Sequence, residues 1–201
     1  MKIICVGRNY QKHIEELQNE KPTEPVIFIK PDSALLRNNA PFFIPDFTKE
    51  VHYEVELVLK IKKLGRHIPE QFALDYVESI GLGIDFTARD LQAKLKAKGL
   101  PWEKAKGFDH SAAISKFVAV PQNLDNLNFS LERNGSIVQQ GNTQRMIHKI
   151  PQLISHISEY FTLKIGDYIF TGTPEGVGPV MKDDELIGKI EDREMFRFRV
   201  K

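Results

Sequence analysis

The sequence of 201 residues contains a single cysteine, Cys5. One cysteine excludes an internal disulfide, and it also excludes a zinc site built on cysteine ligands. Internal repeats and low-complexity linkers are absent as well. A chain of this length without a linker suits one sizeable domain, so we expect residues 1–201 to form a single domain.

The chain also lacks a long apolar run. No segment approaches the ~18 apolar residues of a membrane span. The start, MKIICVGRNY, has a shorter apolar stretch than a secretory signal needs. An excess of charge of one sign is also lacking, because the 28 basic and 27 acidic side chains leave almost no net charge. A nucleic-acid partner or a membrane surface therefore has no electrostatic support. These absences predict a soluble, cytoplasmic protein.

Strand and helix patterns alternate in the first half of the chain, and the second half is rich in strands. The patterns predict strands at 2–7, 26–30, 52–61, 79–86 and 194–200, a hairpin over 128–142, a strand that runs into a glycine-rich loop over 166–180, and helices at 10–18, 68–80, 87–99 and 150–163. Asn134-Gly135 is a typical hairpin turn. Regular strand-helix-strand crossovers are missing from the second half. This argues against a doubly wound parallel sheet and for a mainly antiparallel α+β or β-roll fold.

The predicted helix over 87–99 has recognisable ends. Thr87 and Asp90 fit a capping box, with Thr87 as the N-cap, and Gly99 fits a C-terminal stop. The lysines near Gly99 suit the negative end of the helix dipole, and we interpret them as a solvated helix end. They are Lys94, Lys96 and Lys98.

Two glutamates stand two positions apart in an apolar strand, HYEVELVLKI (52–61). Successive strand residues point to opposite faces, so Glu54 and Glu56 share a face. One interpretation is an amphipathic strand with its polar face in water. The other is that both carboxylates are ligands of one metal ion.

A third carboxylate favours the metal. Asp85 lies in the apolar strand GLGIDF, and a lone buried carboxylate needs a cation or hydrogen bonds. Gly81 and Gly83 share its face and would leave open space for a ligand. The alternative is that Asp85 bonds the amides of the following helix. Three carboxylates would form an oxygen-only site of the kind that Mg²⁺ or Mn²⁺ prefers. His52 could be a further ligand, but we expect it to have a structural role or to contact a ligand rather than the ion itself.

Six blocks of the sequence resemble, in order, those of the fumarylacetoacetate hydrolase family. The resemblance is to its small acylpyruvases and 2-hydroxyhepta-2,4-diene-1,7-dioate isomerase-like members. The blocks are VGRNYQKHIEEL, EPVIFIKPDSAL, VHYEVELVLKI, GIDFTARDLQ, KGLPWEKAKGFD and YIFTGTPEGVGPV. The resemblance covers nearly the whole chain. One departure is Lys182-Asp183-Asp184, where many members have a Gly-Asp turn.

The resemblance implies a β-roll core with peripheral helices, usually a homodimer, and a 2-oxo or 2,4-dioxo acid as substrate. It implies Mg²⁺ or Mn²⁺ held by the carboxylates that match Glu54, Glu56 and Asp85. It also implies functional roles for residues that match the family's motifs. These are the pair His13 and Glu16, the stretch with Arg89, Asp90 and Gln92, the lysine Lys106, and Thr173 as the substrate's anchor.

Each of these residues also has an ordinary interpretation. His13 and Glu16 lie three apart on a predicted helix, so they are either a general base with its orienter or a surface pair. Lys106 either supports a developing oxyanion, with Gln92, or is a solvated loop lysine. TGTPEGVG, with Thr173, either holds the substrate carboxylate or is a tight turn; it is not a phosphate-binding P-loop.

Two further predictions concern the substrate's surroundings. Arg8 and Lys30 are the next candidates for binding its carboxylate. The segment NEKPTEP (19–25) is polar and contains prolines, and it would suit a lid.

The reaction predicted from this set is hydrolysis of a C–C bond in acylpyruvates or related 2,4-dioxo acids. The products are pyruvate and a carboxylic acid. The ion would stabilise the departing pyruvate enolate, and His13 would activate the attacking water. The same chemistry can decarboxylate oxaloacetate or isomerise a hydroxyheptadienedioate, and the sequence leaves both open. A metal-binding protein without catalysis is the alternative from another class.

Overall fold

The computed structural model describes residues 1–18 and 20–201. Within that part the α-helices are α1 (Gln11–Glu16), α2 (Arg89–Ala97), α3 (Glu103–Lys106) and α4 (Ile150–Tyr160). The strands are β1 (Ile3–Gly7), β2 (Val26–Lys30), β3 (Leu35–Leu36), β4 (Val51–Tyr53), β5 (Val55–Ile61), β6 (Val77–Asp85), β7 (Thr87–Ala88), β8 (Ala112–Ile114), β9 (Asn128–Arg133), β10 (Ser136–Asn142), β11 (Tyr168–Phe170), β12 (Gly178–Pro179), β13 (Glu185–Ile190) and β14 (Arg193–Arg199). No described helix has both the length and the apolar character needed to cross a membrane.

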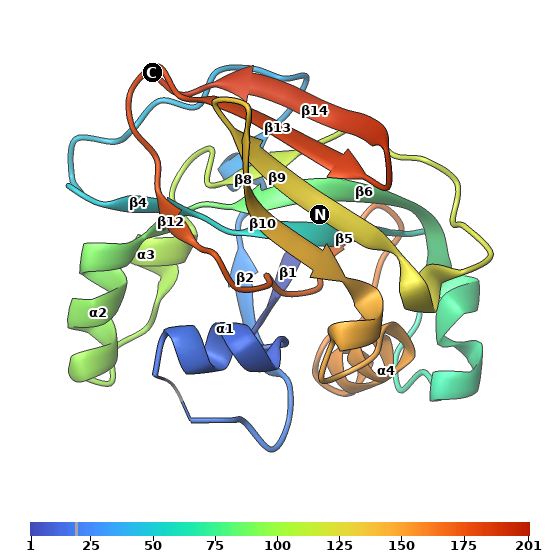
Figure 1. Cartoon of the computed structure of the whole chain (residues 1–201). Helices are drawn as coiled ribbons and strands as arrows, with labels where there is room; N and C mark the ends of the chain where they lie inside the picture. Colours follow the sequence, from blue (N-terminus) through green and yellow to red (C-terminus); the bar gives the residue numbers. More distant parts are fainter. Residues whose placement is uncertain (19) are drawn as a thin grey trace.

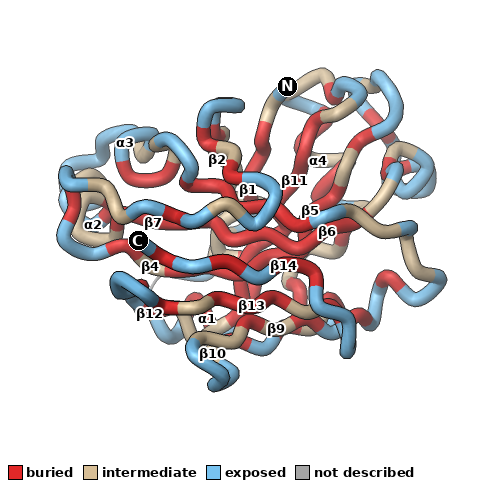
Figure 2. The backbone as a smooth tube through the Cα atoms, turned by 90° about the horizontal axis from the view of Figure 1, so that it is seen from above, coloured by how far each residue is buried: buried red, intermediate tan, exposed pale blue. Residues whose placement is uncertain are grey.

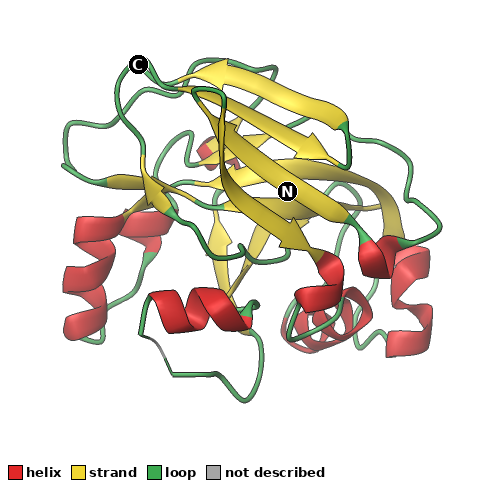
Figure 3. Cartoon of the chain, in the orientation of Figure 1, coloured by secondary structure: helices red, strands yellow, loops and turns green. Residues whose placement is uncertain are grey.

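Three sheets build the molecule (Figure 1). The largest has seven strands in the order β2-β1-β11-β5-β6-β8-β3, and only β1–β11 and β3–β8 are parallel pairs. A four-stranded sheet, β10-β9-β13-β14, is antiparallel throughout. The third, β12-β4-β7, is small. The α-helices lie at the periphery, mostly along one side of the sheets (Figure 3). The predicted α+β, mainly antiparallel β-roll is confirmed.

The core lies between the seven-stranded and four-stranded sheets. Leu82 and Ile84 of β6, Leu131 of β9 and Phe196 and Phe198 of β14 are all buried in it. Figure 2 shows the central strands β1, β5, β6 and β11 as almost continuously buried. Strand β5 is buried on both faces, apart from Lys60. The interpretation of 52–61 as a strand with one face in water is therefore wrong.

Two predicted helix features are wrong. The segment 68–80 is not a helix, because Glu70–Tyr76 forms a short 3₁₀ stretch and Val77 already begins β6, paired with Ile61. Pairing with β5 outweighs helix propensity there. Thr87 is not an N-cap, since it belongs to β7 and α2 starts at Arg89.

The two predicted turn residues behave as expected. Asn134 and Gly135 join β9 to β10, with φ of 54° and 80°. Both angles are those that a two-residue hairpin turn of this kind requires. Gly99 has φ of 62° just after α2, where a left-handed residue ends a helix.

Candidate metal centre and active site

The structure brings the three predicted carboxylates together. Glu56 lies in β5 and Glu54 just before it, and Asp85 ends the neighbouring strand β6. The backbone N–H of Asp85 donates to the carbonyl of Glu54 over 2.8 Å, which fixes the two strands beside each other. One carboxylate oxygen from each residue lies within 4.8 Å of the others, and all three side chains are buried. A metal ion prefers such a set of oxygen atoms.

Three cations compensate two of these carboxylates. Lys106 Nζ donates to Glu54 over 2.8 Å and to Asp85 over 2.7 Å, and Arg89 contacts Glu54 at 2.5 Å. Lys30 Nζ lies 2.7 Å from Asp85 Oδ1, a close ion pair without hydrogen-bond geometry. Burial raises the pKa of Glu54, but Lys106 and Arg89 outweigh it and hold that pKa far below its usual value. Glu54 is therefore ionised.

Glu56 is held differently. Its Oε2 accepts the backbone N–H of Gly172 over 2.7 Å, and no described Lys or Arg forms an ion pair with it. Burial, followed by the nearby charges of Asp85 and Glu54, raises the pKa of Glu56 well above its usual value. A cation between the three carboxylates would offset the cost of holding Glu56 ionised beside two other carboxylates.

The residues fit a hard divalent cation. All three side chains offer oxygen, and buried Asp85 Oδ1 has no hydrogen-bond partner among the described residues. Mg²⁺ or Mn²⁺ would be held by Glu54, Glu56 and Asp85. His52 is not part of this set, since its Nε2 lies 2.8 Å from Glu50 and its Nδ1 accepts from Arg89.

The glycines beside Asp85 do not leave open space, contrary to the sequence prediction. A Cβ on Gly83 would lie 2.7 Å from the ring of Phe170, and one on Gly81 would lie 3.2 Å from the ring of Phe117. These glycines make room for aromatic side chains of the core. Asp85 does not bond the helix amides either, because it pairs with the two lysines.

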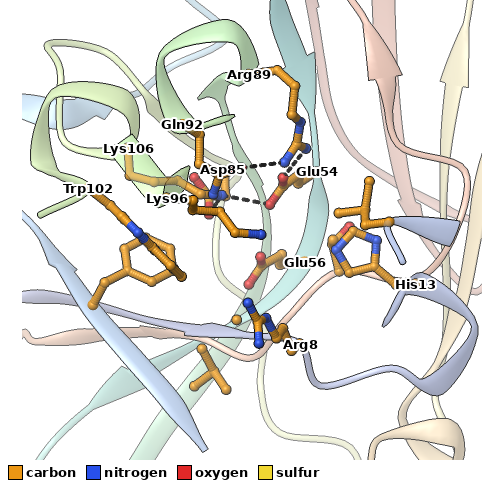
Figure 4. Close-up of a pocket in the computed structure, with 15 residues that line it drawn as sticks. Arg8, His13, Glu54, Glu56, Asp85, Arg89, Gln92, Lys96, Trp102 and Lys106 are labelled. Atoms are coloured by element: carbon orange, nitrogen blue, oxygen red, sulfur yellow. Dashed lines mark hydrogen bonds and ion pairs between the residues drawn. The ribbon is translucent and has the colours of Figure 1, made fainter. Parts of the chain in front are cut away.

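His13 lines the same cavity from α1 (Figure 4). It is 5% exposed, so it is not half of a surface pair. Its Nδ1 lies 3.4 Å from Glu16, which also accepts the backbone N–H of Gly176. Burial lowers the pKa of His13 more than Glu54 and Glu16 raise it. His13 is therefore neutral at pH 7, and with Nδ1–H directed to Glu16 it keeps a lone pair on Nε2.

Lys106 is buried in α3 and is not a solvated loop lysine. Burial lowers its pKa, but Asp85 and Glu54 more than offset this and raise it. Its third hydrogen bond goes to the hydroxyl of Thr87, over 2.6 Å. All three donors of the ammonium group are thus in use. Lys106 therefore holds the carboxylates in place, and support of an oxyanion would require breaking one of these bonds.

The other predicted substrate contacts divide into two groups. Arg8, Arg89, Gln92 and Thr173 line the cavity, and Gln92 Oε1 accepts from Arg89 over 2.6 Å. Lys30 is fully buried and is not among the lining residues. Its Nζ is enclosed by Asp85 and the carbonyls of Phe86, Lys106 and Ser111, so its position does not suit contact with a substrate.

Two residues that take part in the site were not predicted from the sequence. Gln139 of β10 donates from its side chain to Thr173 Oγ1 over 2.9 Å, which leaves the threonine hydroxyl hydrogen available for another acceptor. Lys96 is exposed in the last turn of α2, as the interpretation of a solvated helix end expects, but it also lines the cavity, which was not predicted. Its spacing of four residues from Gln92 on one helix was the available signal.

The predicted lid over 19–25 includes Asn19, which lies outside the described residues. The volume of the cavity is about 40 Å³. That volume accommodates an ion with a few waters.

Comparison with known proteins places this geometry in a family. The family model described as fumarylacetoacetate (FAA) hydrolase C-terminal matches residues 2–199. The chain belongs to the fumarylacetoacetate hydrolase family. The six sequence blocks therefore predicted the family correctly.

Family members with named activities resemble the chain over almost its whole length. Oxaloacetate tautomerase YcgM of Escherichia coli is 46% identical over 188 residues, 92% of this chain and 86% of that protein. The mitochondrial oxaloacetate tautomerase FAHD1 of Bos taurus is 44% identical over 98% of this chain and 90% of its own length. The solved structure of fumarylpyruvate hydrolase from Pseudomonas aeruginosa, in complex with Mn²⁺ and pyruvate, is 35% identical with a TM-score of 0.94, covering all of this chain and 89% of that one.

Proposed function

We propose that this chain is an Mg²⁺- or Mn²⁺-dependent enzyme acting on small 2-oxo acids, with keto–enol tautomerisation of oxaloacetate as its reaction. The observation that carries the proposal is a buried histidine, with Glu16 beside its Nδ1, in one cavity with three buried carboxylates. The names of the bovine and E. coli relatives support the choice of oxaloacetate. From the sequence, oxaloacetate was predicted as a substrate of decarboxylation, not of tautomerisation.

The chain's own residues supply the proton transfer and the binding. When bound, the divalent ion polarises a 2-oxo group and acidifies the neighbouring C–H. His13 Nε2 accepts the C3 proton, and Glu16 orients the ring through Nδ1. Thr173, held by Gln139, donates its hydroxyl hydrogen to the substrate's carboxylate. Water then protonates the 2-oxo oxygen to complete the enol, and His13 Nε2 returns its proton to the water, so that no proton is gained or lost overall.

Hydrolysis of acylpyruvates is the second candidate. The observation that favours it is the same His13–Glu16 pair, because a neutral imidazole held by a carboxylate can take a proton from water as well as from carbon. The Mn²⁺- and pyruvate-bound fumarylpyruvate hydrolase, which has the same fold, supports this candidate. The homodimer, the single domain and the cytoplasmic location stay predictions from the sequence.

The first prediction tests the metal-dependent reaction. Purified protein should accelerate the decay of the enol absorbance of oxaloacetate, and chelator-stripped protein should not until Mg²⁺ or Mn²⁺ is restored. Release of pyruvate from acetylpyruvate measures the second candidate in parallel. A protein that does neither with metal present contradicts the proposed function.

The variant Glu56→Gln tests the metal site without removing the contact that Glu56 makes with the backbone. Glutamine keeps an oxygen that can accept the N–H of Gly172 but removes the charge. Metal affinity, measured by calorimetry with Mn²⁺, should fall by at least about tenfold, since even residues behind the ligands typically contribute that much. Glu50→Gln is the matched control, because Glu50 is an exposed carboxylate outside the cluster. Unchanged affinity in Glu56→Gln would show that the ion binds elsewhere.

The second prediction concerns the anchor for the substrate's carboxylate. Thr173→Val removes one hydroxyl at nearly constant size and should weaken 2-oxo acid binding by about 1–3 kcal/mol, the worth of a hydrogen bond to a charged group. Inhibition by oxalate should weaken in parallel, while Mn²⁺ affinity without substrate stays as in the wild type. An unchanged inhibition constant for oxalate would mean that Thr173 is only part of a turn.

A further inference from the structure

A second cavity lies beside the candidate active site, and we call it the outer cavity. Its volume is about 440 Å³, against about 40 Å³ for the cavity that the carboxylates line. Strand β2 and the connection between α2 and α3 supply its lining, which is mostly apolar and includes Ile27, Ile29, Leu100 and Pro101. An apolar lining around a volume of this size favours an apolar ligand.

Three side chains line both cavities, namely Phe28 of β2, Trp102 just before α3, and Lys106 of α3. Gly7 of β1 lines the candidate active site and Val26 of β2 lines the outer cavity, and these two residues are partners in neighbouring antiparallel strands. The two cavities therefore lie side by side at the edge of the seven-stranded sheet that ends in β2. The three shared side chains form the partition between them.

The partition is tied to the carboxylate cluster. The ring centroids of Phe28 and Trp102 are 6.1 Å apart, and Lys106 Nζ lies 5.1 Å from the centroid of the Phe28 ring. The backbone N–H of Lys106 donates to the carbonyl of Trp102 over 2.9 Å, while its ammonium group holds Glu54 and Asp85. Lys106 is therefore needed by the cluster, whereas the half-buried ring of Trp102 serves the partition alone among the contacts described.

Trp102 also limits the site on a defined side. Figure 4 shows Trp102 and His13 on opposite sides of the three carboxylates. A 2-oxo acid whose head lies at the carboxylates therefore has the histidine on one side and the partition on the other. Beyond the partition lies the apolar volume of the outer cavity.

We propose that Trp102, supported by Phe28, determines the length of the 2-oxo acids that the site binds, by closing the site against the outer cavity. The inference rests on the proposed function, because it assumes that the 2-oxo acid head lies at Glu54, Glu56 and Asp85. A long apolar chain that cannot enter the outer cavity stays in water and gains no burial. A smaller side chain at position 102 would join the two cavities and admit that chain.

Unbranched 2-oxo acids of increasing length test the inference. Pyruvate, 2-oxobutanoate, 2-oxohexanoate and 2-oxooctanoate share the 2-oxo acid head and differ only in the number of methylene groups. Their binding is measured by calorimetry at saturating Mn²⁺, so the readout does not depend on turnover. The wild type should bind the two long acids within about twofold of 2-oxobutanoate.

Trp102→Ala should bind 2-oxohexanoate and 2-oxooctanoate at least about tenfold more tightly than the wild type does, because each newly buried methylene group contributes up to about fourfold. Its affinity for pyruvate should stay within about twofold. Trp102→Leu, a milder change, should show the same order with a smaller gain. Leu100→Ala is the matched control, because exposed Leu100 lines the outer cavity but not the active site.

Affinity for Mn²⁺ without an acid shows whether Lys106 still holds the cluster in each variant. If Trp102→Ala weakens Mn²⁺ binding, Trp102→Leu decides the comparison. The inference is overturned by a wild type that binds the long acids progressively more tightly or binds none of the acids. It is also overturned by a variant at position 102 that gains nothing or gains equally for pyruvate, and by Leu100→Ala gaining as much.

Failure of the proposed function has a different signature. The wild type would then turn over neither oxaloacetate nor acetylpyruvate with metal present. The dependence of binding on chain length, and its change in Trp102→Ala, would still be measured by calorimetry.

Discussion

His13→Ala is expected to lose acylpyruvate hydrolysis by roughly 10²–10⁴-fold, the usual worth of a positioned general base. Tautomerisation of oxaloacetate should fall with it, because both reactions need a proton acceptor on the substrate's reacting side. Decarboxylation of oxaloacetate should fall much less, since loss of carbon dioxide requires no attacking water and no proton acceptor. The measurement is kcat/KM of the variant for the three reactions at saturating Mg²⁺.

Glu16→Gln provides the graded control. Glutamine still accepts a hydrogen bond from Nδ1 of His13 and from the N–H of Gly176, but it carries no charge to favour the protonated ring. Its losses should follow the same order of reactions and be smaller than those of His13→Ala. Equal losses in all three reactions for His13→Ala would mean that His13 acts in binding rather than in proton transfer.

The carboxylate cluster was predictable because it depends on local periodicity. Glu54 and Glu56 share a strand face by their spacing alone, and Asp85 is conspicuous as an acid in an apolar strand. The family resemblance supplied the connection between the two strands. Sheet order then brings them together, because β5 and β6 are antiparallel neighbours with Glu56 opposite Gly83.

The surroundings of that cluster were not predictable in the same way. Whether Gly83 faces a ligand or a ring depends on Phe170, which lies on β11 and far away in the sequence. Lys96 was assigned to solvent because a lysine near a helix C-terminus is ordinary there. The face of α2 that turns toward the cavity is set by packing on α3 and β4, not by the helix's own sequence.

The position of Lys30 could not be predicted from the local sequence either, and Lys30 is the subject of the last prediction. Its ammonium group is wholly buried, 2.7 Å from Asp85 Oδ1, and it donates to the carbonyl of Ser111 over 2.9 Å and to its hydroxyl over 3.0 Å. Lys30→Met keeps the length and apolar stem of the side chain but removes the charge. Among the described residues, Asp85 then keeps only Lys106 as a cation in an ion pair, and the buried backbone carbonyls lose a hydrogen-bond donor.

We expect Lys30→Met to lower the free energy of unfolding by about 3–5 kcal/mol, as when one partner of a buried ion pair is removed. Urea denaturation without added metal measures the loss. Lys60→Met is the matched control, because Lys60 also pairs with a carboxylate, Glu78 at 2.9 Å, but both side chains are partly exposed. That pair should be worth less than about 1 kcal/mol. Similar stability in the two variants would mean that Lys30 is not needed to hold Asp85 in place.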